Sequence, residues 1–362
     1  MTESPETLEA SALEWLARFP GRIVRIRPDG AAYLGRGYDL YRSDDDGAEW
    51  RRVASLPRSP WRRAAEWTRL GTRLLRQELR AVACVGESGL VVSNRQGVFH
   101  GSEGDGLLRP SVIDCGSGPL RPPMRLTARP DGTVVWGEYG AVRSDRPMRL
   151  FASRDRGRTH RVVHTFGNGE IGHVHNVIWD EGEGHYWVLA GDHADHAGIG
   201  RLSDDLQRFE WYVRGQQRFR AVEVFDLGDR LLYATDSEME TNALVVLDKR
   251  GGRSERLREF DGSCIYACRF GGLMALTTSV EPSEVNHGTL ASLWLSRDGD
   301  HWDRAYASEK DGYSAHYFQF GSLVLPSGRS PRETVMFSGQ AVHEMDGRTA
   351  VVRYTGPTSE GR

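Results

Sequence analysis

A short turn motif that recurs along the chain constrains its fold more than any other feature. Residues 40–50 read LYRSDDDGAEW, an apolar strand end followed by Ser-x-Asp-x-Gly-x-x-Trp. Residues 150–160, LFASRDRGRTH, repeat this pattern with His in place of Trp. Residues 293–302, LWLSRDGDHW, repeat it with one turn residue fewer. Self-similarity at a regular period indicates an architecture that is built from repeated units.

Each defining position of the motif has a physical role in a β-hairpin turn. The short side chain of Asp45 can accept hydrogen bonds from the N–H groups of the turn. Gly47 can adopt a positive φ because it has no Cβ to clash, and Trp50 can fold back over the apolar side of the turn. We therefore expect all three copies of the motif to be hairpin turns.

Weaker copies of the turn fill the intervals between these three. Counted together, the turns begin near residues 43, 102, 153, 203, 247, 296 and 344. Their separation of about 50 residues is the period of a four-stranded propeller blade. The sequence therefore predicts an all-β chain that folds as a single β-propeller of seven four-stranded blades over residues 21–356. Six blades is the alternative, because the turns near 247 and 344 keep only the strand-to-turn shape.

Individual strands can be placed in two of the units, where β-branched and aromatic runs lie between Gly, Asp and Asn clusters. One unit is predicted to contain strands over 175–179, 185–190, 199–203 and 209–213. The next is predicted to contain strands over 220–225, 230–235, 243–247 and 253–257.

Two segments depart from this pattern of short strands. Residues 1–20 begin with Ser4-Pro5-Glu6, which is typical of a helix start, and their apolar residues fall on one helical face. We expect an N-terminal helical segment there. The apolar residues of 61–77 also recur at helical spacing, which predicts a helical insertion before the second blade. The surrounding residues 58–80 carry seven Arg against two Glu; we interpret these charges as solvated, with a phosphate or anionic-glycan contact as the alternative.

Charge and composition exclude several classes of protein. The 362 residues carry a formal net charge of −3, which favours neither a nucleic-acid nor a membrane-surface partner. Apolar stretches fall short of a membrane span, and the first 20 residues lack the pattern of a secretion signal. Cys264 and Cys268 would lie about 13 Å apart on a strand, too far to bridge. We therefore expect a cytoplasmic protein; its oligomeric state is not predicted.

The repeated octapeptide is similar to the Asp-box, and the chain resembles the Asp-box, or BNR-repeat, family of sialidase-like β-propellers. The resemblance covers most of the chain as architecture and implies a carbohydrate-directed site at one mouth of the central channel. Sialidases of this family carry an Arg-Ile-Pro signature, three carboxylate-binding arginines, a Tyr–Glu pair and an acid/base Asp. The corresponding segment here, Arg25-Ile26-Arg27-Pro28, is one residue too long, and a clear third arginine is missing. Sialidase activity itself is therefore not expected.

Propeller topology gathers polar residues from distant loops at one mouth of the channel. His173 and His175 alternate by two, so both imidazoles point to one side of a strand, which suits acid–base catalysis or metal binding. Their structural alternative is mutual pairing without a ligand. The candidate catalytic residues are His173, His175, Asp192, Arg220, Asp236 and Tyr317. The candidate substrate-binding residues are Glu138, Tyr139, Gln216, Glu281 and His316, and the candidate metal ligands are His173, His175 and His193.

These residues are compatible with a carbohydrate-active enzyme that acts on an anionic glycan. A lyase needs a cation to neutralise a uronate carboxylate and a His or Tyr to move a proton, and a divalent metal cofactor would assist both. A glycoside hydrolase needs two opposed carboxylates, for which Asp192, Asp236 and Glu138 are available. A propeller that binds a glycan or a protein without catalysis is the alternative. The predicted partner is a carbohydrate or another small polar anion.

Overall fold

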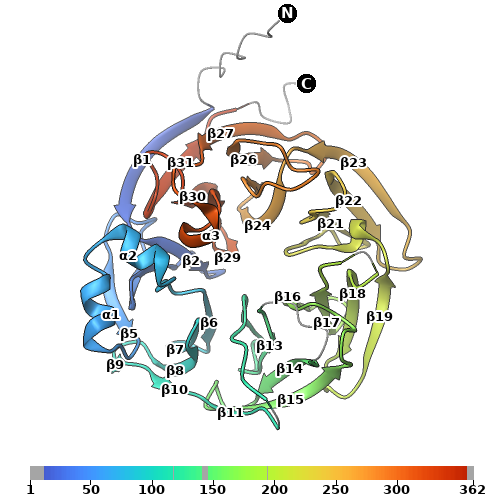
Figure 1. Cartoon of the computed structure of the whole chain (residues 1–362), viewed down its shortest axis with the longest axis horizontal. Coiled ribbons are helices and arrows are strands. Elements are labelled where there is room, and N and C mark those ends of the chain that lie inside the picture. The colour runs from blue at the N-terminus through green and yellow to red at the C-terminus, as the bar shows by residue number, and fades with distance from the viewer. Residues whose placement is uncertain (1–11, 117, 141–145, 194, 357–362) are drawn as a thin grey trace, which may run out of the picture.

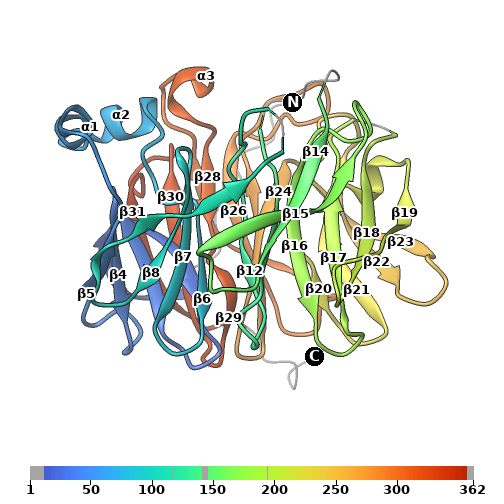
Figure 2. The ribbon, with the colours of Figure 1, turned by 90° about the horizontal axis from the view of Figure 1, so that it is seen from below.

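The computed structural model describes residues 12–356 except 117, 141–145 and 194. Its strands are arranged around a central axis as a β-propeller (Figure 1). Seen from the side, three short helices stand at one face of the ring (Figure 2). None of the helices in the described ranges is long and apolar enough to span a membrane.

Five of the sheets are discrete blades of four or five strands. The first consists of β6 (Ala81–Val85), β7 (Gly89–Asn94), β8 (Gly97–Ser102) and β10 (Arg109–Pro110). The second consists of β12 (Thr127–Ala128), β13 (Val134–Gly137), β14 (Met148–Ser153) and β15 (Thr159–Phe166), with β11 (Val112–Asp114) at its outer edge. The third consists of β16 (Val174–Asp180), β17 (His185–Ala190), β18 (Gly198–Ser203) and β19 (Phe209–Arg214). The fourth consists of β20 (Phe225–Asp226), β21 (Arg230–Ala234), β22 (Asn242–Asp248) and β23 (Ser254–Phe260). The fifth consists of β28 (Ser322–Val324), β30 (Thr334–Gln340), β31 (Arg348–Tyr354) and β1 (Leu13–Pro20).

A ten-stranded sheet makes up the rest of the ring. Its strands, in order, are β27 (Asp303–Glu309), β26 (Leu290–Ser296), β25 (Leu273–Ser279), β24 (Ser263–Phe270), β29 (Ser327–Ser330), β2 (Arg22–Ile26), β3 (Ala32–Arg36), β4 (Asp39–Ser43), β5 (Arg51–Ser55) and β9 (Gly106–Leu107). The short β29 pairs in parallel with both β2 and β24, so the hydrogen bonding continues from one four-strand run into the other.

The prediction of seven separate four-stranded blades, with six as the alternative, was therefore wrong. The structure has five discrete blades and the ten-stranded sheet. The physical reason is that motif spacing reports hairpin turns within a unit. It carries no information about main-chain pairing between units, which here depends on one four-residue strand.

The predicted N-terminal helix was also wrong over the residues that the structure describes, because Leu13–Pro20 form β1. This strand pairs antiparallel with β31, from Leu13 opposite Tyr354 to Pro20 opposite Arg348, and so joins the two ends of the chain in one blade. Residues four apart, such as Trp15 and Phe19, share a face in a strand as well as in a helix. The observed burial alternates with a period of two. The rest of the predicted segment, residues 1–11, lies outside the described residues.

The predicted helical insertion is present, as α1 (Pro60–Ala65) and α2 (Arg69–Leu74). The Thr68 side chain caps α2 by accepting a hydrogen bond from the Gly71 N–H. A third helix, α3 (Ala315–Phe318), was not predicted. Arg73 of α2 is almost fully buried and forms an ion pair with Asp311, just before α3. The arginines of the insertion are thus partly structural, which corrects their interpretation as solvated charges.

All three copies of the turn motif are hairpin turns, between β4 and β5, β14 and β15, and β26 and β27, as predicted. In the second copy, the Ser153 hydroxyl accepts a hydrogen bond from the Gly157 N–H at 2.8 Å. The Asp155 carboxylate accepts from the Thr159 N–H at 2.9 Å and from the Thr159 hydroxyl at 2.7 Å. His160, which replaces the Trp of the motif, is buried and accepts a hydrogen bond from Trp136 Nε1–H.

The hydrophobic core lies between neighbouring sheets. Val135 of β13 and Met148 of β14 pack in one cluster with Val177 of β16 and Val188 of β17, and all four are buried. Burial of such side chains stabilises the fold by about 1.5–3 kcal/mol each. All four cysteines are free thiols, as predicted.

Candidate functional site

The pairing of β16 with β17 brings His173, His175 and Asp192 together. Val174 lies opposite Ala190, so the residues just before β16 meet the residues just after β17. The Gly191 N–H donates a hydrogen bond to the His173 carbonyl at 2.9 Å. Gly191 has a φ of +94°, and a Cβ there would lie 2.0 Å from the His196 carbonyl oxygen. The turn that positions Asp192 therefore requires glycine.

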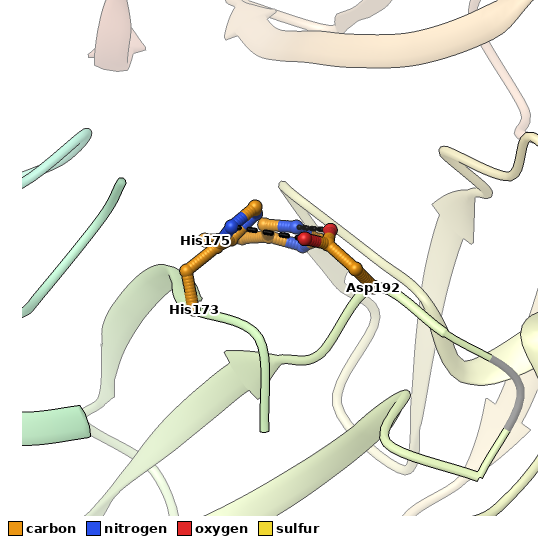
Figure 3. A group of neighbouring side chains, drawn as sticks. All are labelled: His173, His175 and Asp192. Carbon is orange, nitrogen blue, oxygen red and sulfur yellow. Dashed lines mark ion pairs between the residues drawn. The ribbon is translucent and has the colours of Figure 1, made fainter. Parts of the chain in front are cut away.

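The two imidazoles come from the start of β16, and they face the Asp192 carboxylate, which follows the end of β17 (Figure 3). His173 Nδ1 lies 3.0 Å from Asp192 Oδ2, and His175 Nε2 lies 3.5 Å from Asp192 Oδ1. The centroids of the two imidazole rings are 4.7 Å apart. One ligand-capable atom from each of the three residues falls within 4.8 Å of the others. We call this group the His–Asp–His cluster.

The hydrogen bonding of His175 determines which of its ring nitrogens carries the proton. Its Nδ1 lies 2.9 Å from the Ala221 carbonyl oxygen, which can only accept. Nδ1 is therefore the donor, and Nε2 is the ring nitrogen that remains for another partner. Nε2 faces Asp192 Oδ1 and is buried without a hydrogen-bond partner in the described part of the chain, whereas Asp192 Oδ1 also contacts Arg220 Nη2 at 3.2 Å. His175 Nε2 is therefore a buried polar atom that still needs a partner.

The electrostatics favour a neutral His173 imidazole and an ionised Asp192 carboxylate. Burial, followed by the nearby charge of His175, lowers the pKa of His173 to about 3. Burial opposes ionisation of Asp192, but His175, His173 and Arg220 together hold its pKa well below the usual value. A set of imidazole nitrogens and a carboxylate oxygen is a ligand set that zinc and other divalent transition metals accept.

The distances within the cluster also fit a metal ion. Two ligands about 2.1 Å from one ion, at a tetrahedral angle, are about 3.4 Å apart. The observed separation of His175 Nε2 from Asp192 Oδ1 is 3.5 Å. The residues that could hold a cation are therefore His173, His175 and Asp192.

Arg220 connects the cluster with a second group of carboxylates. Its Nη2 lies 3.2 Å from Asp192 Oδ1 and 3.7 Å from both Asp236 Oδ2 and Glu238 Oε1. Burial raises the pKa of Asp236. Burial, together with the Asp236 and Glu238 charges, raises the pKa of Glu281 to about 8. Glu281 therefore keeps a proton at neutral pH, which is the state of a general acid.

Tyr139 forms the wall of the site beside the imidazoles. Its ring centroid lies 4.3 Å from that of His173 and 6.5 Å from that of His175. Burial raises the pKa of Tyr139, so the phenol stays protonated. Arg80 lies over the same ring, 5.6 Å from its centroid, and burial lowers the pKa of Arg80 to about 10. The sequence reasoning missed Arg80, although its position at the end of the arginine-rich insertion is a usable signal.

Several predicted site residues lie elsewhere. His193 is exposed, with its ring 6.2 Å from that of His196, so Asp192 and not His193 completes the cluster. This corrects the predicted metal ligands, because the turn after Gly191 directs only the first of these residues inward. His316 and Tyr317 are exposed on α3 and contact each other. Among the described residues, neither forms a hydrogen bond, ion pair or ring contact with the cluster.

Glu138 and Gln216 also have surroundings that the sequence did not indicate. The Glu138 carboxylate is buried and pairs with the Arg149 guanidinium at 2.7 and 2.9 Å, so its partner is a residue of β14 in the same blade. Gln216 is exposed, and its neighbour Gln217 is buried instead. Gln217 donates a hydrogen bond to the Asp192 carbonyl at 3.2 Å and accepts one from the Ser237 hydroxyl at 2.8 Å. It therefore links the loops that carry Asp192 and Asp236.

Comparison with known proteins identifies the fold and no more. No family model and no curated protein matches the chain. The extracellular domain of BT4673 from B. thetaiotaomicron superposes with a TM-score of 0.58 at 10% identity, over 97% of this chain and 44% of that one. A chain of the mitotic checkpoint complex superposes with a TM-score of 0.59 at 10% identity, over 98% of this chain and 96% of that one. At such low identity the shared feature is the β-propeller architecture alone.

Proposed function

We propose that this propeller is a metal-dependent enzyme that acts on an anionic carbohydrate, with a divalent cation held by the His–Asp–His cluster. One observation carries the proposal. His173 Nε2 and His175 Nε2 are both buried without a hydrogen-bond partner among the described residues, and His175 Nε2 lies 3.5 Å from Asp192 Oδ1. Buried imidazole nitrogens need a partner, and a cation would satisfy them beside the carboxylate.

The surrounding residues support acid–base chemistry next to such a cation. A divalent cation there would act as a Lewis acid towards an anionic oxygen of the substrate. Arg220 offsets the charge of Asp192 and Asp236, so the site tolerates several carboxylates in a small volume. Glu281 holds a proton at neutral pH and would transfer it to the leaving oxygen of the sugar.

The tests separate metal binding from turnover. The full chain is stripped with a chelator and titrated with Zn²⁺, Mn²⁺ or Ca²⁺, and bound metal is counted by elemental analysis after desalting. We expect about one ion per chain in the wild type and loss of it in His175→Ala. His343→Ala, which removes an exposed imidazole in the last blade, is the matched control and should bind like the wild type. Equal metal content in wild type and His175→Ala would overturn the metal site.

Turnover is then assayed with the metal-loaded protein on a panel of polyuronates and other acidic glycans. Elimination is detected by the ultraviolet absorbance of an unsaturated product, and hydrolysis by new reducing ends. We expect one of the two signals in the wild type and its loss in His175→Ala. Saturable glycan binding without either signal would contradict the enzyme and leave a binding propeller as the function.

A further inference from the structure

The structure contains a polar cavity in the channel that is lined by none of the residues of the His–Asp–His cluster. Its volume is about 420 Å³, within the range of small-molecule sites. On β16 its lining runs from Asn176, the residue after His175, to Trp179 near the end of the strand. Four residues of strand separate His175 from Trp179, about 13 Å. The cavity therefore extends from beside the cluster towards the other half of the channel, and none of the three cluster residues lines it.

Three arginines from adjacent strands line this cavity. In the parallel pairing of β29, Arg25 lies opposite Ser327 and Arg269 lies opposite Arg329. Arg25, Arg269 and Arg329 are thus brought together along the β2–β29–β24 strip, and all three line the cavity. We call them the channel arginines.

The carboxylates that line the cavity are fewer than its arginines, and two of them are paired with cations other than the channel arginines. Of the acidic residues that line the cavity, Glu223 accepts a hydrogen bond from a fourth arginine, Arg125, at 2.8 Å. Asp226 forms an ion pair with Lys249 at 2.7 Å, and Glu181 is exposed. In the described ranges, Arg25 forms no ion pair, and its Nε is buried without a hydrogen-bond partner. The positive charge of the cavity wall is thus in excess.

Two of these cations are also held directly opposite each other. Like charges at paired positions of a sheet destabilise it, and an anion between them removes the cost. Burial lowers the pKa of Arg269; the Asp226 carboxylate opposes this change, and the Arg329 charge adds to it. Among the described residues, the Arg269 guanidinium donates only to a main-chain oxygen, that of Asp226 at 3.3 Å. Its bidentate edge remains available for an oxyanion.

We propose that the channel arginines form a binding site for a small organic oxyanion with two or more negative charges, a phosphate ester or a polycarboxylate. Guanidinium groups bind both types through paired hydrogen bonds. The apolar side chains of Leu126, Ile178 and Phe225 line the same cavity and offer a surface for the carbon skeleton of the ligand. This site is independent of the proposed metal site, since the two share no residue.

The test measures binding of inorganic phosphate and citrate to the full chain by isothermal titration calorimetry at low salt. We expect saturable binding of at least one probe by the wild type. Arg329→Gln, a change at an exposed residue, should weaken it about tenfold, and the double change Arg25→Gln, Arg329→Gln should abolish it. Arg208→Gln, on the outer β18–β19 hairpin, is the matched control and should bind like the wild type. Circular dichroism and the midpoint of thermal unfolding check that each variant is folded.

Three results would overturn the proposal. The first is absence of saturable binding of both probes by the wild type. The second is unchanged affinity in the folded Arg329→Gln variant. The third is loss of binding in the double variant His173→Ala, His175→Ala, because the anion would then belong to the other half of the channel. Binding that survives in this histidine variant and is lost in the arginine variant supports the proposal whether or not the His–Asp–His cluster holds a metal.

Discussion

Replacement of the buried His160 should change how the stability of the propeller depends on pH. His160 stands where the turn motif has Trp elsewhere, and it accepts a hydrogen bond from Trp136 Nε1–H at 3.1 Å. Burial lowers its pKa from about 6.5 in the unfolded chain to about 4 in the folded protein. Between these values the unfolded state binds the proton and the folded state does not. The His160 contribution is therefore complete above pH 6.5 and is lost as the pH falls towards 4.

The magnitude follows from the width of this window. One proton taken up on unfolding changes the free energy of unfolding by about 1.4 kcal/mol per pH unit. Over the window from about pH 6.5 to about pH 4, the loss is at most about 3.4 kcal/mol. His160→Gln keeps an acceptor for Trp136 and cannot titrate. We expect the free energy of unfolding of His160→Gln to lack this part of the pH dependence, while the other buried histidines keep their own contributions to it.

The assay is urea unfolding at half-unit steps from pH 4 to pH 8, with wild type and His160→Gln compared at each pH. Trp136→Phe is the control, because it removes the hydrogen-bond donor and leaves the burial of His160, which is the larger cause of the pKa change. Its pH slope should match the wild type even though its overall stability falls. The reasoning is refuted if wild type and His160→Gln show the same slope between pH 4 and 6.5.

Two further changes test the turn motif and the packing beneath the site. Asp155→Ala removes an acceptor for the Thr159 N–H and hydroxyl and for Ser153, so the free energy of urea unfolding should fall by about 1–2 kcal/mol; an unchanged midpoint would contradict the role of this side chain. Gly137→Ala places a Cβ 2.4 Å from the side chain of Val174, so it should lower stability by about 1–3 kcal/mol. The second-site change Val174→Ala should restore part of that loss, and a double variant no more stable than Gly137→Ala would contradict the clash.

The local part of the fold could be predicted from the sequence. The strands expected over 175–179, 185–190, 199–203 and 209–213 agree with β16 to β19 within one or two residues, because alternation and turn residues act over short distances. The strand expected over 220–225 was largely wrong. Its place is taken by η1 (Gln217–Phe219), an irregular segment and the two-residue β20. The signal there was a run of apolar residues, which a buried irregular segment also produces.

Long-range pairing could not be predicted in the same way. Leu13–Pro20 form a strand because β31, more than 300 residues later, offers an unpaired edge. The bridge through β29 depends on Gly328, whose φ of +98° and close approach to the Ile26 carbonyl exclude a side chain. Neither feature leaves a periodic pattern in the sequence.

In the candidate site, too, local features could be predicted from the sequence and long-range contacts could not. The spacing of His173 and His175 correctly predicted two imidazoles within contact distance. His193, which was predicted as the third metal ligand, is exposed outside the cluster, and Asp192 lies beside the imidazoles, because the direction of one turn after Gly191 decides which residue faces inward. Gln217, Arg80 and the channel arginines reach their positions through contacts between blades. Such contacts are determined by the closed ring and not by nearby residues.

The most direct test of the central claim is an anomalous-difference map from a crystal of the full chain grown or soaked with Mn²⁺ or Zn²⁺. The account predicts a peak about 2.0–2.2 Å from His175 Nε2 and from an oxygen of Asp192. A crystal of His175→Ala treated in the same way should lack that peak. A map without a peak at the cluster, in which His175 Nε2 and Asp192 Oδ1 have closed to an ordinary hydrogen bond, would contradict the claim and identify the cation between them as a proton.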